Sequence, residues 1–453
     1  MRRSLVVIAD SDSYVKWGAA LATRLPADWD ARLVIVRSPV LPSARQLAFA
    51  LRGTRFTPDE VRVAGIDELA AVVASERPDA VLLALRGPMV RVVVRVIGTL
   101  PNRPVLLSGF PGITIPAARK AVIYREQVDL VVLHSRREVR DFAANAATMP
   151  VNTVFGLATL PFLEGSGTGA SPAARDSVVF AAQAMVPRTL EERVQLLGWL
   201  VQAARAQPQH RIVLKVRALA GEAQTHFEEY SLAELLHAPE YASEIGSLPP
   251  NLLVEDGPMA DHLSRALALV TISSTAALEA IQREIPVLLL DAFGVSPALI
   301  NTVFVGSGLF GGAEALIAGD YRHPDPAWLA ENYFHGTADD DWVTRLEQLV
   351  LRRDIRPLEL SPQRHNRTGG ALRRAWDRKR MLGPEDASVL GALALVIAVP
   401  TRWTLRRMRA VRRRLSGGVL GGVDEVVLGV APDAGPLVLR QGAAHLGRNS
   451  GNE

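Results

Sequence analysis

The chain has 453 residues, too many for one hydrophobic core, so two or three domains are expected. Its content of 48% apolar and 22% charged residues is typical of a globular protein, and the lack of cysteine excludes disulfides and cysteine-ligated metals. The net charge of +4 has a local origin, because seven arginines lie between Arg402 and Arg414. The rest of the chain therefore lacks the excess of basic residues that is typical of a nucleic-acid-binding surface.

Strand-like and helix-like segments alternate along the first 150 residues. Strands are expected at 4–9, 31–37, 61–63, 80–85, 105–108 and 130–134, and helices at 14–25, 67–76, 88–100, 116–124 and 136–146. This order predicts a parallel sheet with helices on both faces. The apolar run of the first strand ends at Asp10 and is too short for a signal peptide.

A linker and a second set of alternating segments follow. Residues 164–176 are rich in Gly, Ser, Pro and Ala, which is typical of a linker. Further strands are expected at 177–181, 211–216, 252–255, 269–272 and 287–290, with helices at 190–206 and 259–266. The sequence thus predicts an α/β protein with two Rossmann-like parallel-sheet domains, 1–163 and 177–350. They would face a central cleft that holds a ligand at the carboxyl ends of the strands.

The character of the chain changes after residue 350. We interpret the arginine-rich residues 351–382 as a crossing segment and 383–453 as an apolar and basic tail, partly disordered. The apolar run 389–399 is shorter than the about 20 residues that span a bilayer. Two interpretations stay open for 389–414: peripheral contact with an anionic membrane, or a last helix packed on the first domain before a disordered basic tail.

The most informative segment joins two buried strands, at 270–290. Ser273, Ser274 and Thr275 form a turn that opens a helix, and Glu279 lies one helical turn further on. Backbone N–H groups, hydroxyls and the helix dipole would suit a phosphate there, and Glu279 could accept hydrogen bonds from ribose hydroxyls. The alternative is that the three residues only cap the helix.

Other polar groups follow the preceding strands of the same half. Lys215 lies at the end of the strand 211–216 and Arg217 directly follows it. They could neutralise a departing phosphate, or they could be a solvated strand end. Asp256 and Gly257 follow the next strand and could contact a nucleobase, although turn formation alone would explain them.

The first strand leads into carboxylates that could take part in catalysis. Asp12 is our candidate for a general base that deprotonates an acceptor hydroxyl, with Lys16 one turn beyond as an acceptor-binding residue. The alternative role for Asp12 is an N-cap. Asp10 and Asp12 also form a D-x-D pair, but no third ligand is visible, so we expect no metal site.

Two further loops of the first half are acceptor-binding candidates. Gly109 and Gly112 follow a buried strand and could bring backbone N–H groups close to a ligand, or form a simple tight turn. His134 ends the next strand and could touch an acceptor, although a lone histidine there is more often structural.

Taken in order, these segments resemble the GT-B group of glycosyltransferases over about residues 4–350. Within that group they look like bacterial capsule-polysaccharide and sialyltransferase-like enzymes, and like actinobacterial glycosyltransferases of that kind. The resemblance implies a donor-nucleotide site at Ser273, Ser274, Thr275 and Glu279. Those families usually place a His-Pro pair where this chain has Lys215-Val216-Arg217, so both a cytidine monophosphate sugar and a nucleotide diphosphate sugar stay open as donors.

The resemblance implies a metal-independent enzyme that moves a sugar from a nucleotide-sugar donor to a hydroxyl acceptor in cell-surface glycan synthesis. The acceptor would be a glycan or a lipid-linked molecule, and we expect no cofactor and no nucleic-acid partner. We expect a cytoplasmic protein, with peripheral contact with the inner face of the plasma membrane as one interpretation of the tail. Two alternatives are a sugar-nucleotide 2-epimerase and a non-catalytic scaffold that binds a nucleotide or a glycan.

Overall fold

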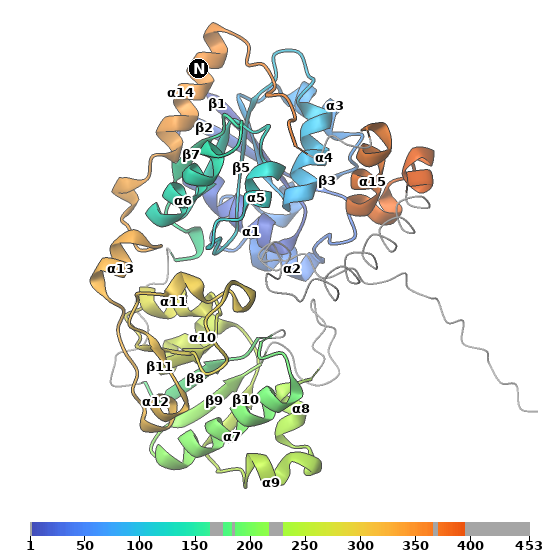
Figure 1. The fold of residues 1–453 in the computed structure, drawn as a ribbon. Helices are drawn as coiled ribbons and strands as arrows, with labels where there is room; N and C mark the ends of the chain where they lie inside the picture. Colours follow the sequence, from blue (N-terminus) through green and yellow to red (C-terminus); the bar gives the residue numbers. More distant parts are fainter. Residues whose placement is uncertain (1, 164–174, 184–185, 217–229, 366–369, 395–453) are drawn as a thin grey trace, which may run out of the picture.

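The computed structural model describes residues 2–163, 175–183, 186–216, 230–365 and 370–394. These residues form two lobes, each built on a parallel β-sheet with helices on both faces (Figure 1). The prediction of two parallel-sheet α/β domains is therefore confirmed.

The first sheet has seven parallel strands in the order β3-β2-β1-β4-β5-β6-β7. The strands are β1 (Arg3–Ala9), β2 (Trp29–Val36), β3 (Arg62–Ala64), β4 (Ala80–Ala84), β5 (Val105–Gly109), β6 (Leu130–Leu133) and β7 (Val154–Leu157). The helices of this lobe are α1 (Asp12–Thr23), α2 (Ala44–Ala50), α3 (Leu69–Glu76), α4 (Gly87–Ile97), α5 (Arg119–Tyr124) and α6 (Arg136–Ala147). Strands such as β4 are apolar throughout, because a hydrophobic core lies on each face of the sheet.

The second sheet has six parallel strands in the order β10-β9-β8-β11-β12-β13. They are β8 (Ser177–Ala181), β9 (Arg211–Lys215), β10 (Leu252–Glu255), β11 (Ala266–Thr271), β12 (Val287–Leu290) and β13 (Phe310–Gly311). The helices are α7 (Leu190–Ala206), α8 (Leu232–Leu236), α9 (Ala242–Ile245), α10 (Met259–Arg265), α11 (Ala276–Gln282), α12 (Ala313–Ala318) and α13 (Pro326–Glu331). Helices α7 and α12 cover one face of this sheet, and α10 and α11 the other.

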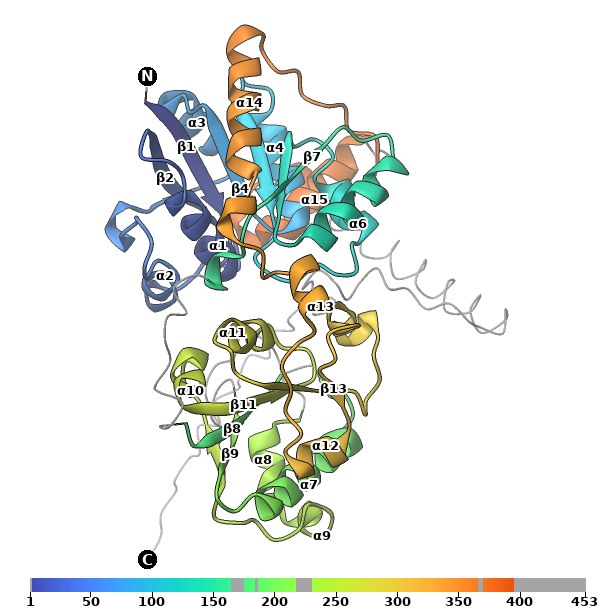
Figure 2. The same ribbon diagram turned by 90° about the vertical axis from the view of Figure 1, so that its left-hand side faces the viewer.

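The chain then returns to the first lobe. Helix α14 (Trp342–Ile355) runs along the first sheet (Figure 2). Its residues Trp342, Leu346 and Val350 belong to the core of the first lobe. The sequence predicts that the second domain extends to residue 350, but the chain has returned to the first lobe at least eight residues earlier. The sequence does not show to which domain this helix belongs, because the amphipathic pattern of α14 would suit packing on either sheet. Helix α15 (Gly370–Leu382) packs on α4.

The carboxyl ends of the two sheets lie toward the junction between the lobes. Helix α1 follows β1, helix α11 follows β11, and both helices contact the short 3₁₀ turn η2 (Pro161–Leu163) that ends the first lobe. This geometry brings the loops singled out from the sequence to the junction. Among the described residues, no helix is long and apolar enough to cross a membrane.

Candidate functional site

Lys215 and the 273–275 turn share one edge of the second sheet. Ala181 at the end of β8 pairs with Lys215 of β9. On its other side, the Thr271 hydroxyl of β11 donates to the Ala181 carbonyl at 3.1 Å. Because neighbouring strands lie about 4.8 Å apart, Lys215 and Thr271 are about 10 Å apart along this edge. Arg217, the second predicted cation, lies outside the described residues.

The three hydroxyls of the turn have different surroundings. Ser273 is buried, with its N–H donating to Gln183 Oε1 at 3.0 Å and its Oγ accepting from Gln183 Nε2 at 2.9 Å. Ser274 Oγ accepts from the N–H of Ala276 at 3.2 Å just before α11, whereas Thr275, at the N-cap position, makes no side-chain capping hydrogen bond. Thr275 is exposed. The sequence did not single out Gln183, which holds the turn from the end of β8.

The charge of Lys16 in the first lobe acts on Glu279 in the second lobe. Glu279 is half-buried on α11, and burial raises the pKa of its carboxyl, while the charges of Lys16 and Arg283 oppose that rise. Lys16 extends from α1 of the first lobe, with Nζ 5.7 Å from the centroid of the Phe162 ring. The structure therefore brings a predicted donor-binding residue and a predicted acceptor-binding residue into the same electrostatic environment.

The two aspartates after β1 differ in exposure. Asp12 is the first residue of α1 and is half-exposed, and its carboxylate accepts from the Ser13 hydroxyl at 3.3 Å. Asp10 is fully buried, with Oδ2 2.7 Å from Arg86 Nε. Burial raises the pKa of Asp10, and Arg86 opposes this rise. The sequence analysis missed Arg86, although it directly follows a predicted strand.

A buried arginine lies beneath the same strand ends. The Arg125 guanidinium donates to Ser108 Oγ and to the Gly109 carbonyl, each at 3.0 Å, and lies 3.9 Å from the centroid of the Phe110 ring. Burial lowers its pKa, and Tyr14 opposes this effect. In a chain so rich in arginine, nothing in the sequence distinguishes Arg125 from solvent-exposed arginines.

Gly109 serves packing. A Cβ at this position would lie 2.5 Å from Trp17 Cζ2 and 2.6 Å from the Val132 carbonyl, so only glycine leaves room for the indole. Gly109 is buried. Gly112 differs, because a Cβ there would meet no described atom within 4 Å. Of the two candidate glycines, only Gly112 lies in open surroundings.

His134 is held inside the first lobe. Its Nε2 accepts from Trp17 Nε1 at 2.7 Å, which leaves Nδ1 to donate to the Ala158 carbonyl at 2.8 Å. The side chain is fully buried, and burial lowers its pKa to about 4. A neutral, fully buried imidazole with both nitrogens engaged has a structural role, which is the alternative that the sequence left open.

Asp256 and Gly257 lie at the far end of the second sheet. They form an exposed turn after β10, where Gly257 has φ +95° and thus needs the freedom of glycine. His262 Nε2 donates to the Asp256 carbonyl at 2.7 Å. Since β9 and β8 separate β10 from β11, this turn is about 14 Å from the Ser273 turn. Within the described residues, no group of three acidic or histidine side chains could hold a metal ion.

Residues 5–349 match the family described as "Putative glycosyltransferase (DUF6716)". This match covers more than half of the chain. The chain belongs to this family. A comparison with curated proteins finds no match for the sequence of this DUF6716 member.

Solved structures of the same architecture agree with the fold described above. A protein described as a putative UDP-N-acetylglucosamine 2-epimerase from Listeria monocytogenes superposes with a TM-score of 0.50 at 12% identity, covering 80% of this chain and 99% of its own. The UDP-GlcNAc 2-epimerase from Neisseria meningitidis, solved with UDP-GlcNAc, gives 0.45 at 10% identity (78% and 99%). The lipopolysaccharide outer core galactosyltransferase WaaB gives 0.45 at 11% identity (77% and 99%). This DUF6716 chain has the GT-B-like fold.

Proposed function

We propose that this DUF6716 protein transfers a sugar from a nucleotide-sugar donor to a hydroxyl group of a glycan or lipid-linked acceptor, in cell-surface glycan synthesis and without a metal. The observation that carries the proposal is that α1 and α11 both contact the η2 turn at the junction of the two sheets, where the charge of Lys16 acts on Glu279. In open α/β sheets, ligands bind at the carboxyl ends of the strands. Family membership supports the same class of reaction.

The donor would lie on the second domain. Ser274 and Thr275 would bind a phosphate, with Ser273 holding the shape of the turn through Gln183. Glu279 would accept hydrogen bonds from the ribose. Lys215, on the same sheet edge, would stabilise the charge that develops on the leaving nucleotide, and we retain this role for Arg217 from the sequence.

The acceptor would lie on the first domain. Asp12 is the better general base of the two aspartates because it is half-exposed, whereas Asp10 is fully buried and paired with Arg86. Lys16 and the open loop at Gly112 would contact the acceptor. We propose no contact for His134 or Gly109. Asp256 and Gly257 would reach only the outer part of a nucleotide, its base.

A thermal-shift panel of uridine, cytidine, guanosine, adenosine and thymidine nucleotides tests the donor site. A nucleotide at about 100 times its Kd stabilises a protein by about 2.7 kcal/mol, which is readily measured. We expect one nucleotide to raise the unfolding temperature of the wild type and to lose this effect in Glu279→Ala. Glu314→Ala is the matched control, because Glu314 is an exposed glutamate in the first turn of α12 and is remote from the junction. Equal binding by Glu279→Ala would reject the donor site.

A 2-epimerase is the second candidate, because such an enzyme shares this fold. It would convert the nucleotide sugar without any acceptor. Incubation of the stabilising nucleotide sugar with the protein alone, followed by NMR of the sugar, separates the two reactions. Epimerised sugar would favour the epimerase. A donor that stays unchanged with the protein alone, but is consumed once an acceptor is added, would favour the transferase. Binding without turnover under either condition would favour the non-catalytic scaffold.

A further inference from the structure

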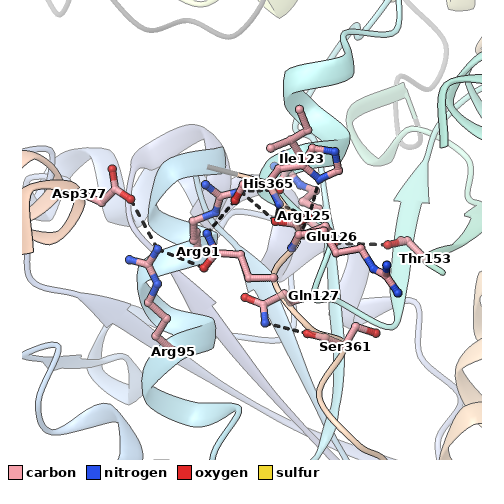
Figure 3. Close-up of polar contacts among 12 residues, drawn as sticks. Arg91, Arg95, Ile123, Arg125, Glu126, Gln127, Thr153, Ser361, His365 and Asp377 are labelled. Carbon is pink, nitrogen blue, oxygen red and sulfur yellow. Dashed lines mark hydrogen bonds and ion pairs between the residues drawn. The ribbon is translucent and has the colours of Figure 1, made fainter. Parts of the chain in front are cut away.

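The segment after α14 is fixed to the first domain by buried polar contacts. Glu126 accepts a hydrogen bond from Arg91 Nη2 at 3.2 Å, and its Oε2 lies 2.7 Å from His365 Nδ1 (Figure 3). Arg91 and Glu126 are each only 3% exposed. Gln127 Nε2 donates to the Ser361 carbonyl at 2.8 Å. The returning chain is therefore part of the first domain by residue 361.

The same attachment continues through α15. The Arg378 guanidinium bonds both oxygens of Asp67, at 2.9 and 2.7 Å, and lies 3.1 Å from Asp386 Oδ1. Met381 and Leu382 enter the core of the first domain. These contacts hold Asp386 on the first domain.

The described chain ends in a helical turn whose large apolar side chains point outward. Val389 is 75% exposed, Leu390 58% and Leu393 51%, while the small residues Gly391 and Ala394 face inward. A helix on a domain surface normally has the opposite arrangement. We name Val389, Leu390 and Leu393 the apolar turn.

Exposed apolar residues also occur on α15 and on a loop that contacts its end. Leu372, near the start of α15, is 46% exposed. Val40 and Leu41 are exposed on a loop whose neighbouring Pro39 packs on Gly383, at the end of α15. Such a grouping is typical of a surface that binds a partner or a membrane.

The charge of this region indicates which partner it fits. Residues 370–414 contain twelve basic and three acidic residues, a net charge of +9, whereas the whole chain carries +4. The rest of the chain therefore carries a net charge of −5. Arg373 and Arg374 are exposed on α15. A second copy of this chain would bring the same positive region against its own, which electrostatics disfavours.

We propose that the apolar turn docks on an anionic lipid surface, with basic residues of the 370–414 sequence contacting lipid headgroups. Leucine and valine side chains enter the boundary between headgroups and acyl chains, and each nearby arginine adds electrostatic attraction. Docking here would fix the first domain, which we propose binds the acceptor, beside the membrane. The docking itself does not depend on the proposed sugar transfer.

Co-sedimentation with vesicles tests the proposal, with the full-length protein and two vesicle compositions. One contains phosphatidylcholine alone, and the other contains 30% phosphatidylglycerol. We expect binding to the anionic vesicles, at least tenfold weaker binding to the neutral ones, and weaker binding as NaCl rises from 0.1 to 0.5 M. The double variant Leu390→Glu/Leu393→Glu should lose at least tenfold in partition coefficient.

The matched control is Leu351→Glu/Ile355→Glu. These two apolar residues are also exposed on a helix of the same domain, at 52% and 88%, but they lie on α14. The control should bind vesicles like the wild type. Equal binding by Leu390→Glu/Leu393→Glu, equal binding to neutral vesicles, or no binding by the wild type would each overturn the proposal. So would a wild-type dimer in gel filtration that Leu390→Glu/Leu393→Glu converts to a monomer, because a second copy would then cover the apolar turn.

Discussion

Tyr333 donates a 2.5 Å hydrogen bond to Glu138 Oε1, and this contact ties the two domains together inside the protein. Tyr333 follows α13, where the chain leaves the second domain, and Glu138 lies in the first turn of α6 in the first domain. The same carboxylate accepts from the backbone N–H groups of Thr114 and His134, each at 2.9 Å. Burial raises the pKa of Glu138, and these hydrogen bonds oppose the rise.

Tyr333→Phe should destabilise the protein by about 1.5–3 kcal/mol, because a buried carboxylate loses a charge-assisted hydrogen bond. Urea unfolding measures the effect. Tyr321→Phe is the matched control: it removes a 3.0 Å hydrogen bond from a tyrosine hydroxyl to the neutral Gln207, within the second domain alone. The control should cost about 1 kcal/mol. If Tyr333→Phe lowers the free energy of unfolding by less than Tyr321→Phe does, the hydrogen bond between the domains does not stabilise the protein as we expect.

His134 should make the protein less stable in mild acid. Its pKa is about 4 in the folded protein, below the ordinary 6.5, because the folded state buries the neutral ring. Between these values the unfolded chain binds a proton that the folded chain does not, so stability falls as pH drops from about 6.5 to about 4. The loss approaches about 3 kcal/mol. Urea unfolding at several pH values gives the free energy of unfolding as a function of pH. This free energy should fall less steeply with falling pH in His134→Gln than in the wild type. His323→Gln, at an exposed position, should keep the pH dependence of the wild type.

Much of the fold can be predicted from this sequence because its buried strands are short, apolar and regularly spaced. The expected strand at 4–9 corresponds to β1, and the expected strand at 287–290 to β12. Strands β7 and β13 were missed. Strand β7 contains a glycine and has a partly exposed first residue, and β13 has only two residues, so neither shows an apolar run. Their place in the sheets depends on pairing with β6 and β12, which is a tertiary effect.

The candidate site was harder to predict, because strand ends show which loops lie near a ligand but not which way each side chain points. Lys16 and Glu279 were both selected, yet their proximity across the junction could not be inferred from their separation in the chain. Conversely, Gly109 follows one predicted strand and His134 ends another, but both contact Trp17 in the interior. The presence of such residues at strand ends does not show whether a residue lies at the junction between the domains or packs in the interior.

Gly109→Ala should destabilise the first domain by about 1–3 kcal/mol, because the added Cβ cannot fit against Trp17 and the Val132 carbonyl. Gly112→Ala is the matched control on the same loop, where the new methyl group meets no described atom within 4 Å. It should change stability by less than about 0.5 kcal/mol. Thermal unfolding of both variants measures the difference. Equal stability of the two variants would mean that Gly109 is not required for packing.

Glu126→Gln should detach the returning segment from the first domain. The change leaves the buried Arg91 without its carboxylate, and the new amide NH₂ group faces N–H donors of Arg364 and His365. Breaking a buried ion pair in this way costs about 3–5 kcal/mol. Urea unfolding measures this cost, and limited proteolysis should show new cleavage between α14 and α15. In the control Glu359→Gln, an exposed carboxylate loses only a 4.0 Å contact with Arg356, so stability and cleavage should match the wild type. Wild-type protease resistance in Glu126→Gln would show that other contacts hold the segment, and the apolar turn would then remain on the first domain without this ion pair.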